Sequence, residues 1–177
     1  MDSMSFLMLK CDLNATLSVI DALPSITDKT RISHYAKYVC RWVMKIEDLN
    51  IMSEEEVIKN GTYFNDDMGW SKECQDILCD ENGNPFNGLL YEYYKNGNLA
   101  YYCYYKDGIE DGEFIQFYPS GKVHRYINFN RGLPLNESYE WYENGNIKEL
   151  TNHYQNDFHY KYIEYDENGK VIKKGEV

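Results

Sequence analysis

Four glycines in the second half of this 177-residue chain stand 24 residues apart, and each closes a short turn segment that follows an aromatic run. They are Gly97, Gly121, Gly145 and Gly169. A fixed period of this size is typical of stacked supersecondary units, because a single unit cannot bury its apolar face alone. The spacing therefore predicts a repeat architecture whose function depends on the surface that the units present.

Alignment of the chain on this period gives columns of apolar and aromatic residues. The first column holds Tyr93, Phe117, Trp141 and Tyr165, the second Tyr91, Ile115, Tyr139 and Ile163, and the third Leu99, Val123, Ile147 and Val171. Residues two apart lie on one face of a β-strand, so the first two columns predict a strand with an aromatic inward face. The third column begins the returning strand, and each unit is expected to be a β-hairpin.

Asn-Gly dipeptides mark three of the expected hairpin turns. They lie at residues 96–97, 144–145 and 168–169. Such a turn needs positive φ, which glycine, asparagine and aspartate adopt at little cost. A second glycine, Gly108 or Gly132, closes the second strand, and Asn156 takes its place in the third unit. Residues 80–88 have the pattern of the tail of one further unit, with a strand that includes 77–79.

Four segments of the repeat carry a pattern that extends beyond glycine spacing. They are residues 87–99, 104–112, 141–148 and 165–171. They resemble the MORN-variant repeats of the bacterial YwqK-type antitoxin family, and the resemblance covers about residues 77–177. It implies an elongated, twisted antiparallel β-sheet of successive hairpins. Because several such proteins are assigned as antitoxins or immunity proteins, it also implies a partner toxin. The chain departs from the pattern at Asn136, Asn156 and Tyr160, where glycine is usual.

Residues 1–76 show no trace of the period. An apolar run at 5–13 indicates a strand, and residues 14–23, stopped by a proline, indicate a short helix. Over residues 29–47, apolar side chains recur at intervals of three and four, which is typical of an amphipathic helix. We therefore expect a helix-containing cap region at 1–76.

A capping box gives the clearest local signal in this region. Ser53 and Glu56 have the spacing of a helix N-terminus, and the short helix is expected to end near residues 60–61. The chain as a whole is predicted to be α+β, with this cap covering one end of an antiparallel sheet at 77–177. A cap is needed because an exposed terminal hairpin invites pairing with another chain.

The formal net charge is −11, and the sequence pI is about 4.8. This balance argues against nucleic acid and anionic membranes as ligands, since both require a basic footprint. It suits a basic protein partner, although solubility alone explains many acidic proteins. The densest acidic points are Glu54, Glu55, Asp66 and Asp67, which we predict as partner-binding residues; the alternative is that they are a solvated helix start and loop.

A cluster of tyrosines is predicted to form a second part of the contact surface. Its members are Tyr101, Tyr102, Tyr104 and Tyr105. Alternation along a strand sends these side chains to both faces of the sheet, so some of them must lie outside the hairpin core. Tyrosine favours binding because it offers a large area at little cost in rotamer entropy.

Motifs for catalysis, metals and export are missing from the sequence. Five cysteines show neither zinc-site nor disulfide spacing, and no nucleotide-binding or hydrolase motif occurs. Residues 80–84 partly match a calcium loop, but Pro85 stands where glycine is required, so a hairpin is favoured. The residues His124, His153 and His159 are interpreted as surface or half-buried side chains. We expect no cofactor, no metal, and a cytoplasmic location, because the first residues lack a basic signal-peptide region.

Two functions of different class fit these features. The favoured one is a non-enzymatic immunity protein or antitoxin that neutralises a basic toxin encoded by a neighbouring gene. The alternative is a repeat scaffold or adaptor that organises a complex and neutralises nothing. An enzyme is the third possibility, and the sequence offers no site for it.

Overall fold

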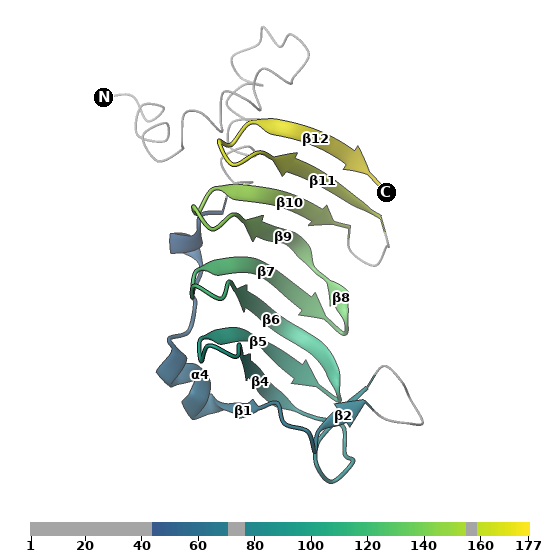
Figure 1. The fold of residues 1–177 in the computed structure, drawn as a ribbon. Coiled ribbons are helices and arrows are strands. Elements are labelled where there is room, and N and C mark those ends of the chain that lie inside the picture. The colour runs from purple at the N-terminus through teal and green to yellow at the C-terminus, as the bar shows by residue number, and fades with distance from the viewer. Residues whose placement is uncertain (1–43, 71–76, 155–158) are drawn as a thin grey trace, which may run out of the picture.

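A computed structural model describes residues 44–70, 77–154 and 159–177 of the chain. Most of these residues form one ten-stranded sheet of hairpin-like strands (Figure 1). Its order is β1 (Gly61–Tyr63), β4 (Gly88–Tyr93), β5 (Leu99–Lys106), β6 (Ile109–Phe117), β7 (Val123–Asn130), β9 (Asn136–Trp141), β10 (Ile147–His153), β11 (Tyr160–Tyr165) and β12 (Val171–Glu176), with β8 (Leu133–Pro134) paired to β7. All neighbours are antiparallel except β1 and β4, which are parallel. The predicted antiparallel sheet of hairpins is confirmed.

Two short helical segments and a second, two-stranded sheet complete the described part. They are η1 (Ile46–Asp48), α4 (Glu54–Asn60), β2 (Gly69–Trp70) and β3 (Leu78–Cys79). The predicted capping box is confirmed, because the Ser53 hydroxyl accepts a hydrogen bond from the Glu56 amide and the Glu56 carboxylate accepts one from the Ser53 amide. The predicted segments at 5–13 and 14–23 and most of that at 29–47 lie outside the described residues.

The five-residue loops between hairpin strands share one hydrogen-bond pattern. In each, the glycine amide donates to the carbonyl three residues earlier, as from Gly97 to Tyr94 at 2.9 Å. The glycines have φ between 81° and 88°, but Asn96, Asn144 and Asn168 are not among the residues with positive φ. The expectation that asparagine shares this conformation is wrong, because a register shift beside the loop leaves only glycine in the left-handed region.

At the other ends of the strands, the loops that follow β5 and β7 contain two residues each. At Asp107–Gly108 and Arg131–Gly132 both residues have positive φ, as the two-residue hairpin turn requires. Glycine recurs there because it adopts this conformation without steric cost. The predicted closing role of Gly108 and Gly132 is therefore confirmed.

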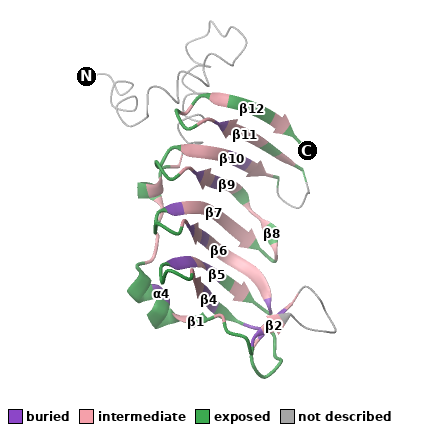
Figure 2. Cartoon of the chain, viewed as in Figure 1, coloured by how far each residue is buried: buried purple, intermediate pink, exposed green. Residues whose placement is uncertain are grey.

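One face of the sheet, which we call the packed face, carries the sequence columns. A cross-strand row runs through Tyr91, Tyr102, Ile115, Tyr126, Tyr139, Leu150 and Ile163. Figure 2 shows that buried residues recur in strand after strand toward the ends that bear the longer loops. The periodic columns are thus core positions, because side chains two apart on each strand reach the same layer.

The segment before α4 lies along the packed face. Met44, Ile46, Leu49, Ile51 and Met52 pack against its core, and Val57 of α4 is fully buried in it. The Met52 amide also donates to the hydroxyl of Tyr102 at 3.2 Å. In Figure 1 this segment passes the loops of several hairpins before it reaches α4 beside β1 and β4. It therefore ties successive hairpins together along the packed face.

Candidate functional site

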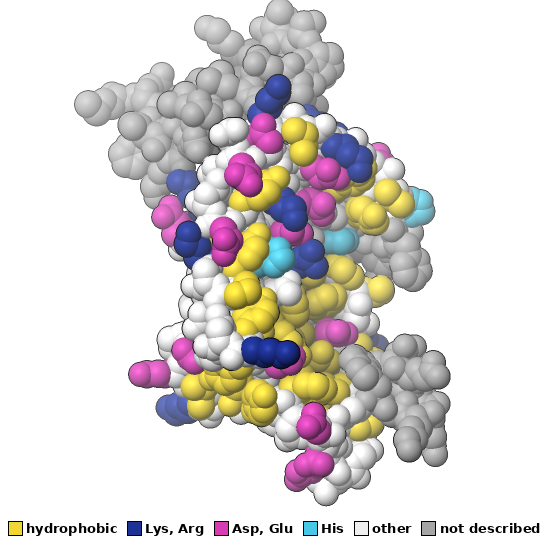
Figure 3. Space-filling model, viewed as in Figure 1, with side chains coloured by type: hydrophobic (Ala, Val, Ile, Leu, Met, Phe, Trp, Pro, Cys, Tyr) yellow, Lys and Arg dark blue, Asp and Glu magenta, His cyan; other side chains and the backbone are white. Residues whose placement is uncertain are grey.

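The opposite face of the sheet, the open face, presents side chains toward solvent along most of its length. The members that matter below are Tyr101, Tyr105, Phe114, Arg125, Ile127, Phe129, Ser138, Glu140, Glu149, Thr151, His153 and Tyr160. At one end the small β2–β3 sheet packs on this face through a cluster of Met68, Leu78, Phe86 and Leu90. Figure 3 shows hydrophobic side chains over the lower strands and charged and histidine side chains over the upper ones.

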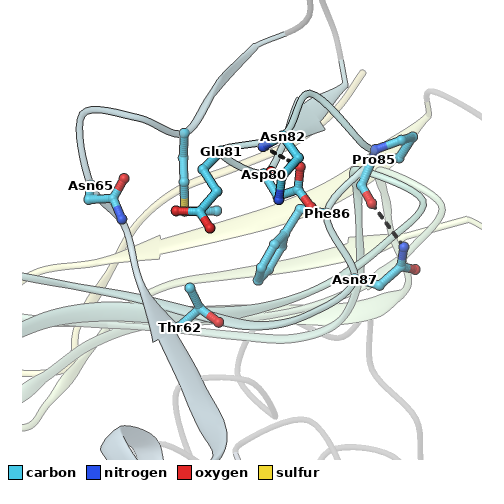
Figure 4. Close-up of a pocket in the computed structure, with 9 residues that line it drawn as sticks. Thr62, Asn65, Asp80, Glu81, Asn82, Pro85, Phe86 and Asn87 are labelled. Carbon is cyan, nitrogen blue, oxygen red and sulfur yellow. Dashed lines mark hydrogen bonds between the residues drawn. The ribbon is translucent and has the colours of Figure 1, made fainter.

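A hollow of about 450 Å³ opens where the β2–β3 end meets the main sheet. It is lined by Thr62, Asn65, Met68, Asp80, Glu81, Asn82, Pro85, Phe86 and Asn87 (Figure 4). Two of these are acids and none is basic, so we call it the acidic hollow. Its apolar side chains are Met68, Pro85 and Phe86. A floor of this kind with carboxylates above it suits the stem and charged end of a lysine or arginine side chain.

The two carboxylates of the acidic hollow differ in whether they are available to a ligand. One oxygen of Asp80 accepts hydrogen bonds from the amides of Asn82 and Asn84 at 2.9 and 2.8 Å. The bond from the Asn84 amide is the main cause that lowers the pKa of Asp80. The Asp80 carboxylate therefore stabilises the turn that contains it. Figure 4 shows the Glu81 carboxylate extending into the hollow between Asn65 and Phe86, where it can meet a ligand.

The hairpin interpretation of residues 80–84 agrees with this geometry. The Gly83 amide donates to the Asp80 carbonyl at 2.9 Å, as in the other loops of the repeat. Across the described residues, His, Cys, Asp and Glu form no group of three that could hold a metal ion.

The structure divides the predicted acidic residues between two places. Asp66 and Asp67 are exposed in the loop after β1, between Asn65 and Met68 of the acidic hollow. The Asn65 side chain accepts a hydrogen bond from the Asp67 amide at 2.9 Å, which fixes this loop beside the hollow. Two predicted acids thus lie beside the acidic hollow without lining it, and the hollow itself combines residues of 62–68 with residues of 80–87.

Glu54 and Glu55 lie elsewhere, in the first turn of α4. Both are exposed, and the first turn of a helix is a favourable place for negative charge. Burial and a hydrogen bond to Glu54 raise the pKa of Tyr93, which places Glu54 beside the packed face. These two acids are not brought together with the acidic hollow.

The predicted tyrosine cluster is split between the two faces, as alternation requires. Tyr102 is 0% exposed on the packed face, so it is a core residue that no partner reaches. Tyr104, on the same face, is 36% exposed. Tyr101 and Tyr105 are half-buried on the open face, and burial raises the pKa of both.

The open-face tyrosines extend an apolar strip from the acidic hollow across the sheet. Tyr105 packs edge-on against Phe86 of the hollow with ring centroids 6.1 Å apart. Tyr101 stacks on Phe114 at 5.9 Å, and Phe114 meets Phe129 at 6.2 Å. Half-buried aromatic side chains next to a charged hollow are suited to binding another protein.

Farther along the open face, one carboxylate contacts two cations and a histidine ring. Glu140 contacts Arg125 at 2.8 Å, His124 at 3.1 Å and the Lys148 ammonium. Burial alone would raise the pKa of Glu140, but hydrogen bonds from Lys148 and Arg125 outweigh it and lower the pKa to about 2. The sequence does not reveal this group, because its only signal is charge at outward positions of successive strands.

Replacing Glu140 with glutamine is expected to lower the free energy of unfolding at pH 7 by about 2 kcal/mol, because Arg125 and Lys148 lose their partner. The side chains of these cations are 42% and 44% exposed, which reduces the effect below that of a dry ion pair. Since folding depresses the Glu140 pKa, its stabilisation is complete above the model-peptide value of 4.5 and disappears as the pH falls toward 2.

Denaturant unfolding of wild type and Glu140→Gln at several pH values measures this difference. The two curves should converge between about pH 5 and pH 2. Glu47→Gln is the control, since Glu47 is 74% exposed in its pair with Lys45. A difference that stays constant down to pH 2 would contradict the assignment.

Comparison with known proteins identifies the repeat. Residues 86–107, 110–131, 135–156 and 159–177 match the MORN repeat variant family. These four segments are therefore repeats of the MORN variant type. Over 50 residues the chain is also 44% identical to the protein named Immunity protein YwqK of Bacillus subtilis (strain 168). That match covers 27% of this chain and 32% of the relative, so it spans about a third of the relative's length.

Two further findings concern the solved structures and membrane-spanning helices. No solved structure matches the chain significantly. Among the helices of the described part, none has both the length and the apolar character needed to cross a membrane.

Proposed function

We propose that this protein is a non-enzymatic immunity protein that binds a partner toxin and neutralises it by occlusion. The observation that carries the proposal is the acidic hollow, which has carboxylates, an apolar floor and no basic residue in its lining. The name of the Bacillus subtilis relative supports the class of function. The partner that this chemistry fits is a basic toxin, encoded by a neighbouring gene and met in the cytoplasm.

The acidic hollow and the apolar strip beside it contribute to binding in different ways. Asp66, Asp67 and Glu81 attract a basic surface, which speeds encounter and aligns the partner. Tyr105 and Phe86 then offer apolar contact in a region where water is easily displaced. An occluded toxin is inactive because its own substrate cannot reach the covered surface.

The structural unit that presents this surface is proposed to be 24 residues long. Equivalent tyrosines link each unit to the next: the hydroxyls of Tyr94, Tyr118 and Tyr142 donate to the carbonyls of Phe117, Trp141 and Tyr165. Asp166 stands at the same place in the last unit, where its carboxylate accepts from the amides of its own turn. Division into a cap region at 1–76 and repeats at 77–177 is part of the same proposal, although β1 at 61–63 already pairs with the main sheet.

Co-expression with the product of the adjacent gene tests the function. If that product stops growth, this protein is expected to restore growth and to co-purify with it. Charge reversal at the hollow, Glu81→Lys, should weaken binding by about 10- to 100-fold, because a lysine would repel the partner cation.

The matched control is Glu47→Lys, which makes the same charge change at an exposed position outside the hollow. It should leave binding within about threefold of wild type. Binding without protection of growth would favour a scaffold instead, and equal loss in both variants would mean that only net charge matters. Either result would overturn the proposal.

A further inference from the structure

A second hollow, of about 250 Å³, lies on the open face between β7, β9, β10 and β11. We call it the Glu149 hollow. The lining residues that matter are Ile127, Pro134, Ser138, Glu149, His153 and Tyr160. It belongs to the same face as the apolar strip, because the strands that separate them are paired in one continuous register. A protein lying along the open face would therefore cover both hollows.

The two carboxylates in this hollow differ in whether they have an ion-pair partner among the described residues. Arg125 and Glu140 also line it and form an ion pair with each other, while Lys148, which does not line the hollow, contacts the same Glu140 carboxylate. Glu149 accepts a hydrogen bond from the Thr151 hydroxyl at 2.8 Å, and no described cation lies within ion-pair distance of it. The hollow thus contains one carboxylate with acceptor capacity left over.

The neutral polar groups of the hollow add hydrogen-bonding capacity without adding charge. The Ser138 hydroxyl and the His153 ring nitrogen Nε2 are 3.0 Å apart. Burial lowers the pKa of His153, so the ring is neutral at pH 7 and does not repel a cation. Ser138 retains lone pairs that can accept a hydrogen bond from a ligand.

The walls are suited to a flat cation. Ile127 and Pro134 form an apolar side, and the Tyr160 ring lies 5.9 Å from the His153 ring. A guanidinium group is planar, stacks on aromatic rings and donates to two acceptors at once, whereas an ammonium group is a strongly hydrated point charge. The combination of a ring, a free carboxylate and a hydroxyl favours guanidinium.

We propose that the Glu149 hollow binds an arginine side chain of the partner protein, with Glu149 as its counter-ion and Tyr160 stacked on its guanidinium group. The identity of the partner rests on the proposed function, whereas the chemistry of the hollow does not. The partner toxin is thereby held at two points, a cation in the acidic hollow and an arginine here, with the apolar strip between them. Two charged anchors on a rigid sheet fix the orientation of the partner as well as its affinity.

Titration of the isotope-labelled full chain with N-acetyl-arginine amide tests the hollow without the toxin. The backbone amide signals of Thr151 and His153 should shift and saturate in wild type, and Glu149→Gln should lower the affinity at least tenfold. N-acetyl-citrulline amide, which has the same shape without the charge, should bind at least tenfold more weakly. Equal shifts with both amides, or unchanged affinity in Glu149→Gln, would overturn the proposal.

Glu164→Gln is the matched control. Glu164 lies opposite Glu149 in the strand register, but it already pairs with Lys173 at 3.1 Å and does not line the hollow. This variant should bind N-acetyl-arginine amide as wild type does. If it loses affinity as Glu149→Gln does, the effect is one of general surface charge and the hollow is not the site.

The same two variants are then compared in binding to the adjacent gene product. Glu149→Gln should lower that affinity at least tenfold, and Glu164→Gln should leave it unchanged. If the gene product does not bind wild type while the arginine titration succeeds, the proposed function fails and the assignment of the hollow stands. If the gene product binds wild type and Glu149→Gln equally, the hollow is not part of the interface.

Discussion

Replacing Trp141 with alanine is expected to lower the free energy of unfolding by about 4 kcal/mol. The side chain is 2% exposed at the end of β9, and its ring stacks on Tyr139 with centroids 5.7 Å apart and an angle of 14° between planes. Alanine would leave a cavity in the packed face that neighbouring strands cannot close, because their positions are fixed by the sheet ladder.

Denaturant unfolding measures this loss. The transition is monitored by circular dichroism of the backbone, because this signal does not depend on the tryptophan that is removed. Tyr154→Ala is the control, since Tyr154 is 39% exposed just beyond β10 and the Lys161 ammonium lies 5.5 Å from its ring centroid. That variant should cost less than about 1 kcal/mol. If the two variants were equally stable, Trp141 would not be a core anchor.

Hydrogen exchange adds a spatial expectation for Trp141→Ala. In a stacked array each hairpin contacts chiefly its neighbours, so destabilisation spreads from the altered unit and weakens with distance. Amides of β7, β9, β10 and β11 should lose more protection than those of β4 and β5. Uniform loss over all strands would show that the array unfolds as a single unit.

The packed face could be predicted from the sequence because it repeats. Tyr91, Ile115 and Tyr139 occupy one column and lie in one cross-strand row, since equal chain length per hairpin returns each strand to the same register. Trp141 was likewise predicted from its column. Periodicity fixes which residues share a face, and burial follows from their apolar character.

The turns show where local chemistry was less informative than spacing. Asn96 and Gly97 suggested a hairpin turn that needs positive φ, which both residue types adopt easily, but the loop contains five residues and only Gly97 has positive φ. Asn96 instead accepts from the Asn98 amide and donates to the Pro119 carbonyl of the next unit. The Asn96 side chain thus makes a contact between units, which the pattern of a single hairpin does not predict.

The acidic hollow could be predicted only in part. The charge density at Asp66 and Asp67 pointed to this region, but Glu81 and Phe86 reach it through the β2–β3 sheet and the parallel pairing of β1. Each feature depends on a strand of the aperiodic part, β1 or β2, which no periodic register relates to the repeats. Contacts made by non-repeating segments depend on tertiary packing, and sequence periodicity does not predict them.

Gly108→Ala is expected to lower the free energy of unfolding by about 3 kcal/mol or more. Gly108 has φ of 79°, and a Cβ there would overlap the Ile77 side chain and lie 2.6 Å from the Leu78 carbonyl oxygen. Backbone cannot move away as a side chain does, because the Leu78 amide donates to the Gly108 carbonyl and the Gly108 amide donates to the Phe86 carbonyl, both at 2.8 Å.

Gly97→Ala separates steric overlap from backbone strain. Gly97 has φ of 88°, but a Cβ there would meet nothing within 4 Å, so only the strain of about 1 kcal/mol applies. Thermal or denaturant unfolding of both variants measures the difference. Equal losses would mean that only the backbone conformation requires glycine at position 108 and that β3 leaves room for a Cβ there.

The two glycine variants should also differ in partner binding. Gly108 holds Leu78 and Phe86 in place, and Phe86 forms the floor of the acidic hollow, so Gly108→Ala is expected to displace that floor and weaken binding of the toxin at least tenfold. Gly97 lies in a loop that does not line the hollow, so Gly97→Ala should bind as wild type does in any temperature range where it is folded. Wild-type affinity in folded Gly108→Ala would show that the partner does not use the hollow, because the same clash that destabilises β3 must move Phe86.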